Sequence, residues 1–306
     1  MKILVIGAGA YGLALSNILT DKNEVTIYSS IKEEIETLKT TNKNEKLFPD
    51  TTLQNIKYIN QIEEQYDLTI LALPTNIIEQ ELNKIKDNIK DTPMIITSKG
   101  IYNNKFPYEI VKEIIKTENI SILSGPSFAK DVIKKEPISL TLAPKNIDIF
   151  NEKYVKIETT KDILGLELCG TLKNIFAIGS GILAGMNKSE STKAAYLTKI
   201  INETKEIIKK LGGDENTILL SCGIGDIILT CTSSNSRNYT LGYKIGKQDP
   251  IQEYINQTTI EGLNALKEYK KLLQGTPIEI INILYEIIYN NQKPEILMDY
   301  IVKKAW

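Results

Sequence analysis

The chain has 306 residues, of which 42% are hydrophobic and 25% charged, with a formal net charge of −1 and no histidine. Neither sign of charge forms a long block, which argues against a nucleic-acid partner, and the three cysteines lack metal-ligand spacing, which argues against a metal site. The length suits two domains of ordinary size, and without histidine any proton chemistry must fall to Lys, Asp, Glu, Tyr or Cys.

The first predicted element is a strand over Lys2–Ile6 that runs into a glycine turn and an apolar helical pattern. No basic leader precedes the strand and free thiols suit a reducing compartment, so we expect a cytoplasmic protein. Gly7 suits the tight turn, Gly9 lets a pyrophosphate approach the backbone, and Gly12 lets the helix pack against the strand. The pattern predicts a dinucleotide site with its phosphates at the helix N-terminus. The alternative is an ordinary glycine-rich turn.

The end of the second predicted strand, Glu24–Tyr28, bears on the choice of cofactor. An NAD-specific site usually places Asp or Glu there, where the carboxylate binds the ribose hydroxyls. Here Ser30 and Lys32 follow, which suit a 2′-phosphate, and Glu33 and Glu34 lie slightly too far along unless the register shifts. The sequence therefore favours NADPH over NADH.

The rest of the first half alternates between apolar strands and helical patterns. Strands are predicted at 67–73, 94–98, 120–124, 138–143 and 154–158, and helices at 77–89 and 107–116. This alternation indicates a Rossmann-type α/β domain with a mainly parallel sheet, whose ligand lies beyond the carboxyl ends of the strands. Lys99, Gly125 and Ser127 fall at such ends, although Lys99 is equally well explained as a solvated turn residue.

From residue 161 onward the pattern is helical, with segments predicted at 162–186, 189–211, 259–273 and 277–289. We therefore expect an NAD(P)-binding domain over residues 1–160 and an all-α, substrate-binding domain over residues 161–306. The apolar run around residues 175–186 is interrupted by glycines and falls short of the roughly 20 residues of a membrane span, so no stable membrane insertion is expected.

Lys173 stands out because it lies in an almost wholly apolar helical segment. Burial would lower its pKa toward the range where an ammonium gives up a proton, which suits acid–base work on an alcohol or a carbonyl. The alternative is a lysine that extends to the helix edge. Asp226 and Glu261 also have structural explanations, as a helix N-cap and as part of a capping box with Thr258.

Arg237 is the only arginine among the 37 basic residues of the chain. A lysine supplies charge, but only arginine presents a planar fork of donors for bidentate binding of phosphate or carboxylate. One arginine retained in such a lysine-rich chain is more readily tied to an anion than to solubility.

Taken together, these segments resemble the bacterial NAD(P)-dependent glycerol-3-phosphate dehydrogenases over essentially the whole chain. The Gly-Pro-Ser-Phe-Ala loop and Ser-Arg-Asn are not generic dehydrogenase features. The matching pieces, in the order of the family, are Gly7-Ala-Gly9-Ala-Tyr-Gly12, Ser98-Lys99-Gly100, Ser124-Gly-Pro-Ser-Phe-Ala129, Gly170-Thr-Leu-Lys-Asn174, Gly225-Asp226, Leu229-Thr-Cys231, Ser236-Arg-Asn238 and Glu261-Gly262.

The resemblance implies reversible hydride transfer between dihydroxyacetone phosphate and sn-glycerol 3-phosphate, feeding phospholipid synthesis. It makes Lys173 the general acid/base, with Asp226 holding its ammonium and Arg237 with Asn238 binding the substrate phosphate. The positions it implies for substrate contact are Lys99, Gly125, Ser127, Lys173, Asp226, Ser236, Arg237 and Asn238. Those it implies for cofactor contact, beside the three glycines, are Ala10, Tyr11, Ser30, Lys99, Ala129, Arg237, Thr259 and Glu261.

Two departures from the family pattern qualify these roles. Relatives often carry Arg or His where this chain has Ser30, which weakens the grip on a 2′-phosphate and leaves the use of both cofactors open. After Asn238 the chain lacks the further basic residues of many relatives, which makes the phosphate pocket less positive. The sequence does not fix the oligomeric state, and a homodimer is compatible with it.

Two other functions fit parts of the pattern. A β-hydroxy-acid dehydrogenase also follows a Rossmann half with a lysine-bearing helix, but its lysine and asparagine are usually spaced apart rather than adjacent, as Lys173 and Asn174 are. A non-catalytic NAD(P)-binding regulator would not need Lys173, Asp226 and Arg237 together.

Overall fold

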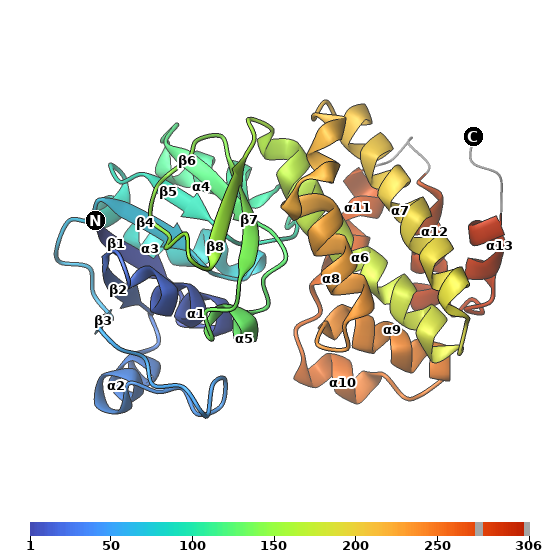
Figure 1. The fold of residues 1–306 in the computed structure, drawn as a ribbon, viewed down its shortest axis with the longest axis horizontal. Coiled ribbons are helices and arrows are strands. Elements are labelled where there is room, and N and C mark those ends of the chain that lie inside the picture. The colour runs from blue at the N-terminus through green and yellow to red at the C-terminus, as the bar shows by residue number, and fades with distance from the viewer. Residues whose placement is uncertain (273–277, 303–306) are drawn as a thin grey trace. The chain divides into compact units, whose positions relative to one another are not determined.

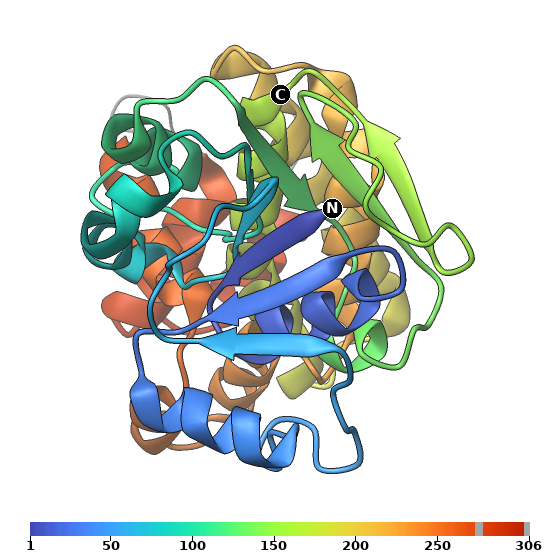
Figure 2. The ribbon, with the colours of Figure 1, turned by 90° about the vertical axis from the view of Figure 1, so that its left-hand side faces the viewer.

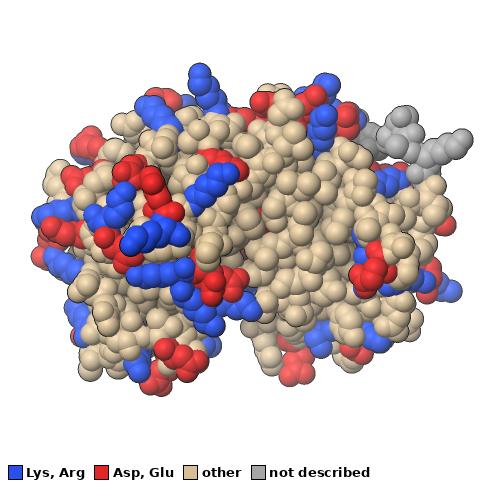
Figure 3. All heavy atoms as spheres, viewed as in Figure 1, with Lys and Arg blue, Asp and Glu red and all other residues tan. Residues whose placement is uncertain are grey.

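The computed structural model describes residues 1–272 and 278–302. The chain divides into two compact units (Figure 1). The first comprises residues 1–98 and 106–163, and the second comprises residues 99–105 with the described residues from 164 onward. On the face seen in Figure 3, acidic and basic side chains are interspersed rather than gathered into one field of a single sign.

The first unit is built on one eight-stranded sheet in the order β3-β2-β1-β4-β5-β6-β7-β8. Neighbouring strands are parallel except for β6 and β7, so the predicted mainly parallel sheet is confirmed. The order of β1 to β6 is the 3-2-1-4-5-6 order of dinucleotide-binding folds. The strands are β1 (Lys2–Ile6), β2 (Glu24–Tyr28), β3 (Ile56–Ile59), β4 (Leu68–Leu71), β5 (Met94–Ile96), β6 (Ile120–Ser124), β7 (Ile138–Ala143) and β8 (Val155–Thr159).

Helices cover both faces of this sheet. Side chains alternate along a strand, so Ile3 and Val5 of β1 join the core that includes α1 and Val132 of α5. Figure 2 shows α1 and α5 on one side of the sheet and α3 and α4 on the other. The helices are α1 (Ala10–Leu19), α2 (Lys32–Thr41), α3 (Ile78–Ile89, preceded by a 3-10 turn at Thr75–Ile77), α4 (Pro107–Ile115) and α5 (Ala129–Val132).

The strand register places the glycine turn beside the end of β2. Ile6 at the end of β1 pairs with Tyr28 of β2 and with Leu71 of β4. The Gly7 amide continues this ladder by donating to the Tyr28 carbonyl oxygen at 2.9 Å. The carboxyl ends of three parallel strands therefore meet where the sequence predicts the dinucleotide.

The named elements of the second unit are all helical over its described residues, as predicted, and an isolated bridge joins Tyr102 and Lys105 in the loop of residues 99–105. Two short helical turns, Glu215–Leu219 and Ser221–Gly225, lead into α8. The predicted helix ends at residues 273 and 277 lie outside the described residues. The helices are α6 (Ile163–Gly185), α7 (Glu190–Lys210), α8 (Asp226–Thr232), α9 (Arg237–Lys247), α10 (Gln252–Gln257), α11 (Glu261–Leu272), α12 (Glu279–Tyr289) and α13 (Ile296–Val302).

Helix α6 forms the core of this unit. It is longer than the apolar run noted in the sequence, and its 23 residues are long and apolar enough to cross a membrane by length and composition alone. In the structure 94% of its most apolar window is buried within the protein. Helix α6 therefore uses its apolar character to pack against its neighbours in the second unit.

Glycines allow α6 and α9 to approach backbone to backbone. Gly181 and Gly185 of α6 lie against α9, and Gly242 and Gly246 of α9 lie against α6. A methyl group at Gly242 would stand 1.9 Å from the carbonyl oxygen of Ile178, and the other three positions are similarly tight. The repeated small residue every fourth position thus fixes the distance between the helix that carries Lys173 and the one that begins at Arg237.

We expect Gly242→Ala to destabilise the protein by about 3 kcal/mol, because an added methyl forces two backbones apart in a packed core. The measurement is the free energy of unfolding in urea. Lys247→Ala, an exposed change in the last turn of the same helix, should stay within about 0.5 kcal/mol of the parent protein. Equal stability of the two variants would contradict the close approach of α6 and α9.

Candidate active site

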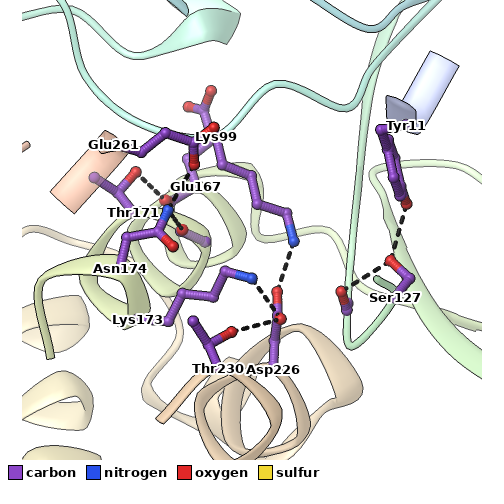
Figure 4. Close-up of polar contacts among 12 residues, drawn as sticks. Tyr11, Lys99, Ser127, Glu167, Thr171, Lys173, Asn174, Asp226, Thr230 and Glu261 are labelled. Atoms are coloured by element: carbon purple, nitrogen blue, oxygen red, sulfur yellow. Dashed lines mark hydrogen bonds and ion pairs between the residues drawn. The ribbon is translucent and has the colours of Figure 1, made fainter. Parts of the chain in front are cut away.

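Lys173 is buried in the middle of α6 with only 8% of its surface exposed. Its Nζ donates to Oδ1 of Asp226 at 2.5 Å (Figure 4). The alternative of a lysine that extends to the helix edge is therefore wrong. Burial lowers the pKa of Lys173 to about 8, against the opposing effect of the Asp226 carboxylate. An amine with such a pKa can both donate and accept a proton near neutral pH.

Asp226 is fully buried at the first position of α8. Its second carboxylate oxygen, Oδ2, accepts from Nζ of Lys99 at 2.6 Å. Burial alone would raise the pKa of Asp226, but the charges of Lys173 and Lys99 outweigh it and hold the pKa below its usual value. The N-cap explanation is wrong, because no side chain caps α8 and the Asp226 carboxylate binds the two lysines.

Lys99 follows β5 in the loop that belongs to the second unit. Its side chain is 17% exposed and forms an ion pair with Asp226, so it is not a solvated turn residue. Its like charge is one of the causes that lower the pKa of Lys173. Two ammonium groups thus share one carboxylate, and the three side chains converge (Figure 4).

Thr230 belongs to the same cluster and was missed by the sequence analysis. Its Oγ1 donates to Oδ1 of Asp226 at 3.4 Å. The signal was present, because residues four apart on a helix lie on the same face and Thr230 is four residues after Asp226. Thr230 gives the carboxylate a further donor inside the helical unit.

A second polar network lies next to this cluster along α6. Asn174 donates to Oε2 of Glu261 at 2.8 Å and accepts from the Asn238 amide at 3.0 Å. Asn238 in turn accepts from the Gly262 amide at 2.9 Å. Glu261 is the first residue of α11, so the predicted capping box with Thr258 is wrong. The network ties the start of α11 to the turn of α6 that carries the lysine.

Ser236 and Arg237 mark the start of α9. Ser236 is the N-cap, and its hydroxyl accepts from the Tyr239 amide at 3.3 Å. Arg237 is the first helical residue and is exposed. Within residues 1–272 and 278–302, no acidic side chain forms a recorded salt bridge with Arg237. An exposed guanidinium beside a helix N-terminus is suited to an anion.

In the first unit, the three glycines of the turn after β1 have different surroundings. Gly7 has a φ of +114°, and a methyl group there would lie 2.5 Å from the Ala72 carbonyl oxygen, while one at Gly12 would lie 2.1 Å from that of Gly7. A methyl at Gly9 would meet nothing within 4 Å. The protein's own packing therefore explains Gly7 and Gly12, whereas Gly9 leaves open space beside the start of α1.

No side chain caps α1, which begins at Ala10, so its first amides remain available to a phosphate. The residues of this turn fit a pyrophosphate group. Such a group would lie against the backbone of Gly9 and the first turn of α1.

The remaining predicted residues lie in several places. The Tyr11 and Ser127 hydroxyls are 3.0 Å apart, and Ser127 donates to the Gly125 carbonyl oxygen at 3.1 Å (Figure 4). Ala129 is the first residue of α5. Ser30 and Thr259 are both exposed, Ser30 just after β2 and Thr259 just before α11. Among the residues that the structure describes, no group of three His, Cys, Asp or Glu side chains could hold a metal.

The 3-2-1-4-5-6 sheet with its glycine turn, together with a buried lysine held by an aspartate in a helical unit, defines a nicotinamide-dinucleotide-dependent oxidoreductase. Comparison with known proteins identifies the family of oxidoreductases to which the chain belongs. The chain belongs to the NAD-dependent glycerol-3-phosphate dehydrogenase family, whose N-terminal model matches residues 2–149 and whose C-terminal model matches residues 162–299. The predicted resemblance is confirmed.

Similar proteins support this assignment along the whole chain. A glycerol-3-phosphate dehydrogenase (NAD(P)+) of Staphylococcus epidermidis is 36% identical over 313 residues, covering 95% of this chain and 94% of the relative. One of Leptospira biflexa is 33% identical over 319 residues, covering 96% and 95%. The crystal structure of glycerol-3-phosphate dehydrogenase from Coxiella burnetii has the same fold, with a TM-score of 0.91, 23% identity and 99% of each chain covered.

Proposed function

We propose that this protein catalyses reversible hydride transfer between a nicotinamide cofactor and the C2 position shared by dihydroxyacetone phosphate and sn-glycerol 3-phosphate, for glycerophospholipid synthesis. The observation that carries the proposal is the buried cluster of Lys173, Asp226 and Lys99 in a member of this family. In this assignment residues 1–160 bind the cofactor and residues 161–306 bind the substrate.

Lys173 is the general acid in the direction of reduction. A bound nicotinamide cofactor would supply the hydride, and negative charge would develop on the carbonyl oxygen of the substrate. The Lys173 ammonium stabilises that charge and donates a proton from Nζ to the oxygen. In the reverse direction the neutral amine accepts the proton of the C2 hydroxyl. A pKa of about 8 suits both directions.

Asp226 and Lys99 set the charge and the position of Lys173. The Asp226 carboxylate holds the reacting ammonium through Oδ1, while Oδ2 holds Lys99. Because the carboxylate is shared, neither lysine is fully neutralised, and the cluster keeps a net positive charge for the developing oxyanion. We assign Lys173 and Asp226 as the catalytic pair.

Arg237 is the proposed ligand of the substrate phosphate. Its exposed guanidinium can bind two phosphate oxygens at once, and fixing the remote phosphate orients the reacting carbon. We propose that the other substrate contacts come from Lys99, Gly125, Ser127, Lys173, Asp226, Ser236 and Asn238.

For the cofactor, we propose that both NADH and NADPH are accepted, with Ser30 and Lys32 as the groups that bind a 2′-phosphate. The sequence preference for NADPH rests on these two side chains. The other proposed cofactor contacts are Gly7, Gly9, Ala10, Tyr11, Gly12, Lys99, Ala129, Arg237, Thr259 and Glu261. We further propose a cytoplasmic enzyme whose reaction needs no metal, with its composition as the support.

The direct test is the oxidation of NADH and NADPH by the purified protein in the presence of dihydroxyacetone phosphate. Unphosphorylated dihydroxyacetone should be reduced with a kcat/KM lower by about a hundredfold or more, since it lacks the group that orients it. Equal rates with both compounds would contradict a phosphate-dependent enzyme.

Arg237→Lys should lower kcat/KM for dihydroxyacetone phosphate by at least about tenfold, because lysine keeps the charge but loses the bidentate fork. The slow residual reaction with dihydroxyacetone is the matched control. Dihydroxyacetone carries no phosphate, so at a cofactor concentration that saturates the variant its reduction should be unaffected by the same substitution. A parallel loss with both compounds would mean that Arg237 acts on something other than the phosphate.

A further inference from the structure

Glu34 is held at the end of β2 by the side chain of a serine, Ser29. The Ser29 hydroxyl donates to Oε2 of Glu34 at 2.7 Å and accepts from the Ile31 amide at 3.2 Å. Ser29 is buried, with 7% of its surface exposed, so this hydroxyl has a fixed place. Glu34 is half-buried in the first turn of α2, where the helix dipole favours a negative charge.

This carboxylate lies where a dinucleotide-binding fold reads the ribose of the adenosine half. Glu34 lies slightly beyond the position, roughly 20 residues after the last glycine of the turn, at which the acidic residue of such folds binds the ribose 2′-hydroxyl. The Gly7 amide bonds the last residue of β2, Tyr28, at 2.9 Å, so the turn and the end of β2 are adjacent. By residue spacing alone, Glu34 is too far along the chain to reach the ribose. The Ser29 bond ties it back to the strand end.

The charge of Glu34 is not neutralised by a salt bridge among the described residues. Across residues 1–272 and 278–302, Glu34 has no recorded salt bridge with a lysine, and the Ser29 hydroxyl contacts only one of its two oxygens. Ionised carboxylate oxygens accept several hydrogen bonds, so Glu34 retains capacity for a hydroxyl donor. Next to it, Ile31 exposes 60% of its surface, which gives the adenosine half an apolar surface to lie on.

We propose that Glu34, positioned by Ser29, is the residue that discriminates between the two cofactors: it accepts from the ribose 2′-hydroxyl of NADH and repels the 2′-phosphate of NADPH. The inference rests on the proposed use of a nicotinamide dinucleotide, and not on the substrate. In this proposal Glu34 favours NADH, whereas Ser30 and Lys32 favour the 2′-phosphate of NADPH. The balance of these three side chains fixes the ratio of the two affinities.

The test is a fluorescence titration of the full chain with NADH and with NADPH, without substrate, for the parent protein and for Glu34→Gln. Removing the charge should lower the ratio of the NADPH dissociation constant to the NADH dissociation constant by about tenfold or more. Glu33→Gln is the matched control, since it removes the same charge one residue earlier in the same helical turn. Its ratio should stay within about twofold of the parent value.

Ser29→Ala separates the position of the carboxylate from its charge. Without the serine the carboxylate is no longer held, so the ratio should move in the same direction as in Glu34→Gln but less far. A Glu34→Gln ratio that moves no further than the Glu33→Gln ratio would overturn the proposal. Because no substrate is present, the result stands even if dihydroxyacetone phosphate is not reduced. A parent protein that binds neither dinucleotide would overturn both proposals.

Discussion

Replacing Lys173 by alanine is expected to lower kcat for dihydroxyacetone phosphate reduction by at least about three orders of magnitude. Its Nζ is the proposed source of the proton, and it also carries the charge that stabilises the developing oxyanion. Because Lys99 is held on the other oxygen of the same carboxylate, we expect that it does not take the place of Lys173. The loss should fall on kcat, because the interaction is strongest in the transition state.

The measurement is steady-state turnover together with cofactor titration. The dissociation constant for NADH should change little in Lys173→Ala, because none of the proposed dinucleotide contacts is altered. Lys210→Ala, which removes an exposed lysine at the end of α7, is the control and should retain parent turnover. Near-normal turnover in Lys173→Ala would remove the lysine from its proposed role.

The pH profile distinguishes proton transfer from simple positioning. With a pKa of about 8, Lys173 is protonated below that pH and neutral above it. Reduction needs the ammonium, so its kcat/KM should fall as the pH rises through about 8. Oxidation of glycerol 3-phosphate needs the neutral amine, so its kcat/KM should rise over the same range.

Much of the fold could be predicted because strands buried within a sheet are apolar runs with clear ends, and the bounds of β6 and β7 were predicted to the residue. Several elements were not predicted, and two of them show the physical reason. Strand β3 is a four-residue edge strand with one buried side chain, Tyr58. Helix α2 buries only Ile35 and Leu38, so its sequence has almost no apolar periodicity.

The site was only partly predictable. Lys173 was visible in the sequence because a charge inside an apolar helix needs a partner. The second ammonium group bound to Asp226, that of Lys99, could not be predicted from the sequence pattern. Lys99 and Asp226 are 127 residues apart, and only the fold brings them together. The Ser29–Glu34 bond depends on how the backbone turns from β2 into α2, which residue spacing alone does not determine.

Asp226→Asn is expected to be the most destabilising change in the site, by about 3 kcal/mol at neutral pH. The amide keeps the shape of the side chain but removes the charge that compensates two ammonium groups. The pKa of Asp226 is lowered in the fold, so its ionised form contributes stability above the unfolded pKa, and that contribution is lost as the pH falls through the folded value. The parent protein should therefore lose this contribution in acid, and the variant should lack it at every pH.

Glu203 on α7, in the same unit, is an acidic residue whose ionisation destabilises the protein instead of stabilising it. Burial raises its pKa to about 6, so its ionised form opposes folding, fully so above that pH. Glu203→Gln should therefore stabilise the protein at neutral pH, by about 1 kcal/mol. If the two acid-to-amide changes shift the free energy of unfolding in urea in opposite directions, the charge of Asp226 stabilises the protein. Two changes of the same sign would contradict that account.

Catalysis in Asp226→Asn then tests whether the carboxylate tunes Lys173. The carboxylate raises the pKa of Lys173 against burial and against Lys99, so its removal should lower that pKa further. The fall in the rate of dihydroxyacetone phosphate reduction should begin well below pH 8, and kcat at neutral pH should drop by about a hundredfold or more. A merely structural aspartate would reduce the rate without moving the pH at which it falls. A fixed pH profile would therefore exclude the tuning role of Asp226.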